Sequence, residues 1–132
     1  MNASFRLIIA SLIACLLGAM PAVAAGPDPD TDAVMRVKLA AAQRLLGGIA
    51  LSDFSVVRTN AAILTTLSGQ RGWAALQTPD YELFSTRFRL AAVALDEAAK
   101  EKRIDAVTTA YQELTLSCVA CHKYLRDGPR KR

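Results

Sequence analysis

Aromatic residues are scarce in this sequence, and so are signals for β-strands. Aromatic residues make up 6% of the 132 residues, although 52% are hydrophobic, and alanine supplies much of that share in place of valine, isoleucine and tyrosine. Such a composition favours helices over strands. There is no internal repeat, and low-complexity sequence is confined to a short leader and the C-terminal tail. The composition therefore predicts an all-α fold.

Histidine and cysteine are rarer still. The only histidine is His122, and the three cysteines are Cys15, Cys118 and Cys121. A structural zinc site usually needs four ligands, and the three residues of the C-terminal cluster have no second cluster to complete one. No general acid, general base and nucleophile form a recognisable constellation either. We therefore expect neither a zinc site nor enzymatic activity.

Positive charge is concentrated at the C-terminus. The formal net charge is +4, but five basic residues and one acidic residue lie among the last ten positions, and the domain before them is close to neutral. A nucleic-acid-binding domain carries its positive charge on one face or along a helix of its fold. The excess of basic residues therefore describes a tail, and we expect no nucleic-acid partner.

One long hydrophobic run lies at the N-terminus. It extends from Leu7 to Leu17 without a charge, follows Arg6 and precedes Ala22-Val23-Ala24. A basic start, an apolar run too short to span a bilayer and an A-x-A site are the features of a secretory signal. We predict cleavage after residue 24 and export to the periplasm.

The remaining chain is long enough for one domain. We divide the sequence into a signal (residues 1–24), a flexible leader (25–30), a folded domain (31–126) and a basic tail (127–132). The mature part holds no transmembrane segment, and only Cys118 and Cys121 remain in it. A competing interpretation places a lipid anchor on Cys15, because Leu12-Ile13-Ala14-Cys15 resembles a bacterial lipobox.

Four amphipathic helices are predicted from the spacing of apolar residues. We expect Thr31 or Asp32 to cap the first helix, Ser52 the second, and Thr78 the third, with Pro79 at its first helical position. Four such helices with short connections predict an antiparallel up-down-up-down four-helix bundle. The expected inner faces are, helix by helix, Met35, Leu39, Ala42, Leu46 and Ile49; Phe54, Val57, Ala61, Leu64 and Leu67; Tyr81, Phe84, Phe88, Ala91, Leu95 and Ala98; and Ile104, Val107, Tyr111, Leu114, Cys118, Cys121 and Leu125.

One motif in the fourth helix indicates a chemical function. Cys118-Val119-Ala120-Cys121-His122 is C-x-x-C-H, the attachment signature of c-type haem. Residues three and four apart share a helix face, so both thiols can reach the two vinyl groups of one porphyrin. His122 can then place an imidazole nitrogen on the iron as the proximal ligand. The motif predicts one covalently bound haem c at one end of the bundle.

The cysteine pair has two other interpretations. A thioredoxin-like dithiol stands at the start of a helix after a strand, where the helix dipole lowers the pKa of one thiol, whereas Cys118 lies towards the end of a helix in a chain without strand signals. A structural disulfide would leave His122 without a role. A haem-free helical interaction or thiol-redox module is therefore the alternative to a haem protein.

The position of the motif narrows the class of haem protein. Only ten residues follow His122, and none is methionine, which excludes the small class I cytochromes c.

The sequence resembles the class II cytochromes c, the cytochrome c prime family and its low-spin relatives. The resemblance lies in Cys118 to His122 with Arg126 four residues beyond, and more weakly in Asn60 to Leu67 followed by Trp73. It departs from that family in Tyr124, because members often carry the aromatic residue one position later. The resemblance implies a four-helix bundle with the motif near the end of the last helix.

A single methionine is available for the other side of the iron. In an up-down-up-down bundle the first and fourth helices are antiparallel, so Met35 lies at the same end as His122. If its sulfur binds, the iron is a low-spin His/Met electron carrier, which the resemblance permits because low-spin class II members use a first-helix methionine. If Met35 only packs in the core, the iron is five-coordinate, as in cytochromes c prime that bind NO and CO. The other expected cofactor-binding residues are Leu39, Leu64, Leu67, Tyr81, Phe84 and Phe88 in the wall, and Arg126 beside the haem propionates.

Together these patterns predict an exported mono-haem cytochrome that transfers one electron at a time between redox partner proteins. The basic tail suits an acidic partner or an anionic membrane surface, and otherwise it is simply solvated. A homodimer is a further option that the sequence leaves open.

Overall fold

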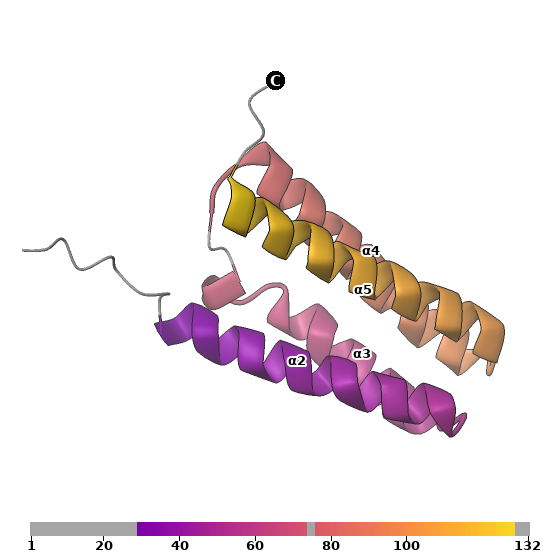
Figure 1. Ribbon diagram of the computed structural model, residues 1–132. Coiled ribbons are helices and arrows are strands. Elements are labelled where there is room, and N and C mark those ends of the chain that lie inside the picture. The colour runs from indigo at the N-terminus through magenta and orange to yellow at the C-terminus, as the bar shows by residue number, and fades with distance from the viewer. Residues whose placement is uncertain (1–28, 74–75, 129–132) are drawn as a thin grey trace, which may run out of the picture.

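A computed structural model describes residues 29–73 and 76–128. Its elements are the α-helices α2 (Pro29–Ala50), α3 (Phe54–Leu67), α4 (Pro79–Lys100) and α5 (Ile104–Asp127), with a short 3-10 helix, η1 (Arg71–Trp73), between α3 and α4. The described residues contain no strand. Figure 1 shows α2 beside α3 and α4 beside α5, with the start of α2 and the end of α5 at the same end of the bundle. The all-α, up-down-up-down four-helix bundle is confirmed, whereas the predicted signal, Cys15 and most of the tail lie outside the described residues.

Helix α4 begins as predicted, and α2 begins earlier than predicted. The Thr78 hydroxyl accepts a hydrogen bond of 3.2 Å from the backbone N–H of Tyr81, which caps α4. Helix α2 already starts at Pro29, so the expectation that Thr31 or Asp32 precedes it is wrong. Proline is well suited to the first turn of a helix, because a backbone N–H at that position has no acceptor within the helix and its absence therefore costs nothing.

The cap of α3 differs from the prediction by one residue. The carboxylate of Asp53 accepts hydrogen bonds from the backbone N–H groups of Ser55 at 3.1 Å and Val56 at 3.0 Å. Ser52, the predicted cap, instead has a φ of 53° in the turn that reverses the chain after α2. A carboxylate at a helix start also interacts favourably with the helix dipole, so Asp53 is the more stabilising cap.

The predicted inner face of the first helix is wrong by one position around the helix. Buried positions in α2 are Val34, Lys38, Ala41 and Leu45, whereas Leu39 is 60% exposed and Leu46 is also exposed. Both stripes have helical spacing, and the predicted one is the stripe without a lysine. The lysine is accommodated because aromatic rings lie around its amine, as described below.

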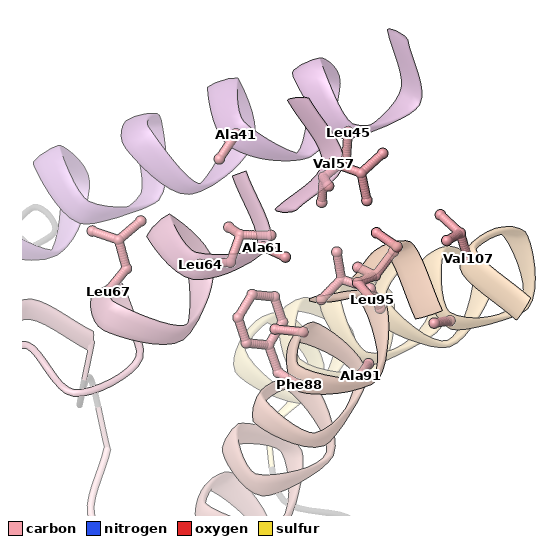
Figure 2. Packing of buried hydrophobic residues seen from close by; sticks show 14 of the residues in the cluster. Ala41, Leu45, Val57, Ala61, Leu64, Leu67, Phe88, Ala91, Leu95 and Val107 are labelled. Atoms are coloured by element: carbon pink, nitrogen blue, oxygen red, sulfur yellow. The ribbon is translucent and has the colours of Figure 1, made fainter. Parts of the chain in front are cut away.

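The inner faces of the other three helices largely match the prediction. Figure 2 shows Phe88 and Leu95 of α4 directed towards Ala61, Leu64 and Val57 of α3. The exception is Leu125 at the end of α5, which is 41% exposed. The buried hydrophobic residues of these helices are Val57, Ala61, Leu64 and Leu67 in α3; Tyr81, Phe88, Ala91, Ala92, Leu95, Ala98 and Ala99 in α4; and Val107, Ala110 and Leu114 in α5.

Element η1 is held against the start of α2 by a glycine. A Cβ added at Gly72 would lie 2.6 Å from the backbone oxygen of Asp30, so no larger residue fits between the two segments without a shift of the backbone. This close approach positions Trp73, which is 5% exposed, against Phe88 and Ser85 of α4. None of the described helices is long and apolar enough to cross a membrane.

Candidate functional site

Helices α2 and α5 are aligned by a contact between them. The phenolic hydroxyl of Tyr111 donates a hydrogen bond of 3.2 Å to the backbone oxygen of Ala42. The two helices are antiparallel, and two turns of helix correspond to about seven residues. Two turns from this contact, Met35 of α2 is therefore level with Cys118 of α5. The expectation that Met35 lies at the same end of the bundle as His122 agrees with this register.

The two cysteines lie on the inner side of α5. Both are free, half-buried and packed against the hydrophobic core, whereas Val119 between them is 60% exposed on the opposite side. His122 is exposed at the edge of this inner face. Within the described residues, no three His, Cys, Asp or Glu side chains are arranged to hold a metal ion directly. Two free thiols one turn apart on an inward face fit covalent attachment of a planar cofactor.

Lys38 is the buried cation of this end of the bundle. It is 7% exposed, and its amine lies 4.2 Å from the ring centroids of both Trp73 and Phe88. A desolvated cation–π contact contributes about 2 kcal/mol, whereas burial of an ammonium group costs several kcal/mol. The rings therefore compensate the burial only in part, and desolvation lowers the pKa of Lys38.

Lys38 interacts electrostatically with Cys118, Cys121 and His122 of the motif. Nearby Cys118 and Cys121 raise the pKa of Lys38, opposing the larger effect of its burial. Burial raises the pKa of the Cys121 thiol, and Lys38 acts against that rise. Partial burial lowers the pKa of His122, and the charge of Lys38 lowers it further. A neutral imidazole is the form that binds a metal, so these effects favour ligation.

The aromatic wall beside Lys38 is fixed by hydrogen bonds. Trp73 packs on Phe88 with ring centroids 4.7 Å apart, and its indole N–H donates to the hydroxyl of Ser85 at 3.0 Å. The hydroxyl of Tyr81 donates to the backbone oxygen of Trp73. Both polar groups of the buried indole residue are therefore satisfied, which holds the ring in place.

A second aromatic contact joins the start of α4 to the end of α5. The rings of Phe84 and Tyr124 lie 5.5 Å apart, and the hydroxyl of Tyr124 is 3.2 Å from that of Thr78. Tyr124 follows His122 by two residues, so the contact anchors the helix segment that carries the motif.

Most, but not all, of the residues expected at the site belong to the hydrophobic core. Met35 is half-buried and packed against the core, and Leu64, Leu67, Tyr81 and Phe88 are buried. Leu39 is not brought to the motif, because it belongs to the exposed side of α2. Arg126 is exposed and pairs with Asp127 at 2.9 Å. Lys38 was not among the residues expected at the site, because lysine is normally exposed and the rings that cover its amine come from distant parts of the chain.

The outer side of the motif faces a different surface. Val119 and Ala120 line a groove between α4 and α5, together with Leu90, Leu116 and several alanines. This groove lies on the opposite side of α5 from the two thiols, and the attachment chemistry does not use it.

Two of the solved structures that are similar to this chain are of cytochrome c prime from Alcaligenes xylosoxidans. A ferrous variant with bound nitric oxide is 20% identical, has a TM-score of 0.57 and is matched over 76% of this chain and 94% of that chain. A variant with bound carbon monoxide is 21% identical, has a TM-score of 0.57 and is matched over 82% of this chain and 98% of that chain. No protein-family model and no curated protein sequence matches the chain. The resemblance to cytochrome c prime is thus confirmed at the level of the fold.

Proposed function

We propose that this chain is an exported mono-haem c-type cytochrome that carries one electron at a time between protein partners. The observation that carries the proposal is the position of C-x-x-C-H, with two free, inward-facing thiols on the last helix of a cytochrome c prime fold. When bound, haem supplies a ferric/ferrous couple. The sequence of residues 1–24 supports export, and the basic tail supports an acidic partner.

Attachment is the role of Cys118 and Cys121. Each thiol adds across one vinyl group: its sulfur bonds to one carbon, its hydrogen goes to the other, and no oxidant is needed. Because the two cysteines are one helical turn apart on the inner face, one planar ring can bond to both. His122 then supplies the proximal nitrogen from the same helix.

Met35 is proposed as the distal ligand. It is half-buried, lies on the helix opposite the motif and is level with Cys118. A thioether ligand raises the reduction potential of a haem iron relative to two nitrogen ligands.

A five-coordinate, gas-binding protein is the second candidate. It is supported by the two solved structures, each of which holds a diatomic gas. In that case Met35 only packs in the core, and the distal side remains open to NO or CO.

The visible spectrum of the purified, reduced protein, recorded with and without CO, tests the proposal. We expect a low-spin spectrum that does not change with CO. A high-spin spectrum that changes with CO would favour the gas-binding candidate. A protein whose mass shows no covalent haem, with two thiols free or joined in a disulfide, would refute both and leave a haem-free helical module.

A further inference from the structure

A buried cation that has no anionic partner among the described residues lies on α2, on the side towards the motif. The amine of Lys38 is covered by the rings of Trp73 and Phe88, and the side chain is almost wholly buried. The ion pairs formed among the described residues all lie at the surface, and none includes Lys38. A buried charge is normally paired with an opposite charge, so this position is electrostatically incomplete.

The position of Lys38 relative to α5 follows from the contact between Tyr111 and Ala42. Lys38 lies one turn before Ala42 on the same side of α2. Because α2 and α5 are antiparallel, one turn back along α2 corresponds to one turn forward along α5, in the direction of Cys118.

The missing partner must be an anion that enters the bundle next to the two thiols. Haem carries two propionate carboxylates, and a carboxylate is the group with which a lysine forms a short, charge-assisted hydrogen bond. We propose that Lys38 forms an ion pair with one haem propionate, an inference that rests on the proposed haem attachment. Lys38 is thus a positioning residue: it selects the orientation in which one propionate lies inside the bundle.

The pair has a consequence for the iron. An uncompensated carboxylate close to the iron stabilises the ferric form, because that form carries one more positive charge. The ammonium group of Lys38 offsets this effect and favours the ferrous form. Loss of the ammonium group should therefore lower the reduction potential.

Three variants of the haem-loaded protein test the inference. Lys38→Met removes the charge and keeps most of the volume, Lys38→Arg keeps the charge, and Lys100→Met removes an exposed charge at the last turn of α4, at the opposite end of the bundle. We expect Lys38→Met to shift the propionate bending mode in the resonance Raman spectrum and to lower the potential. Lys38→Arg and Lys100→Met should leave the Raman mode close to that of the unaltered protein. If the propionate bending mode of Lys38→Met is the same as that of the unaltered protein, the inference is overturned.

A crystal structure of the unaltered haem protein decides the question if Lys38→Met does not mature. We expect the Lys38 nitrogen within ion-pair distance, about 4 Å, of a propionate oxygen. A Lys38 nitrogen bound to the iron, or one without a carboxylate partner, would overturn the inference but leave the cytochrome assignment intact. If the measured mass of the purified protein shows no covalently bound haem, that result would instead refute the proposed function itself.

Discussion

The phenolic hydroxyl of Tyr111 on α5 donates a hydrogen bond of 3.2 Å to the backbone oxygen of Ala42 on α2. These two helices touch along only a short stretch, whereas α4 packs along much of α5. The hydrogen bond therefore joins α2 directly to α5, in addition to the packing of α3 against α4 that links the two halves of the bundle. It also indicates the level at which Met35 and Lys38 lie relative to the motif.

Tyr111→Phe should loosen this connection without emptying the core. The substitution removes one hydroxyl, and a half-buried hydrogen bond contributes about 1 kcal/mol. Urea unfolding of the haem-loaded protein should give a lower midpoint with an unchanged slope. An unchanged midpoint would show that the hydroxyl does not hold the two helices together.

A second prediction concerns the hydroxyl of Thr78, which caps α4 and lies 3.2 Å from the hydroxyl of Tyr124. Thr78→Ala should destabilise the protein by about 1–2 kcal/mol, because it removes the cap and the contact together. Tyr124→Phe removes only the contact and should cost less, whereas Thr78→Ser keeps the cap and should cost least. Unfolding by urea measures all three, and equal costs for Thr78→Ala and Tyr124→Phe would show that the cap is not important.

The neighbouring glycines of α2 offer a matched pair. A Cβ at Gly47 would meet no atom within 4 Å, whereas a Cβ at Gly48 would lie 3.1 Å from methyl groups of both Val56 and Val57. Glycine inside a helix costs about 0.5–1 kcal/mol relative to alanine. Gly47→Ala should therefore raise the free energy of unfolding, and Gly48→Ala should fail to do so, because α3 packs against that position. Equal gains in both variants would contradict the close approach of the two helices.

The helix count, the connectivity and the motif could be predicted from the sequence, because each depends on local signals. Thr78-Pro79 specifies the start of α4, and the spacing of C-x-x-C-H is by itself enough to indicate haem attachment. These signals do not depend on how the helices face one another.

The inner face of α2 could not be predicted, because two stripes with the same spacing compete for it. The stripe containing Met35 and Leu39 is the more hydrophobic, but the bundle buries the one containing Val34 and Lys38. Lysine on a buried face is normally unfavourable, and what makes it tolerable here is the pair of rings from Trp73 and Phe88. Those rings come from distant parts of the chain, so no local pattern around Lys38 reveals them.

Met35 provides the last prediction, which separates iron ligation from packing. Met35 is half-buried against the core and level with Cys118, so Met35→Ala removes both a sulfur and apolar volume. Met35→Leu keeps most of the volume and removes only the sulfur. If the sulfur binds iron, both variants should turn the reduced protein high-spin and reactive towards CO. If Met35 only packs in the core, neither variant should change the visible spectrum. Met35→Ala should then lower the free energy of unfolding by no more than about 5 kcal/mol, and Met35→Leu should lower it by less than about 1.5 kcal/mol. A spectrum that stays low-spin in both variants would rule out ligation by Met35.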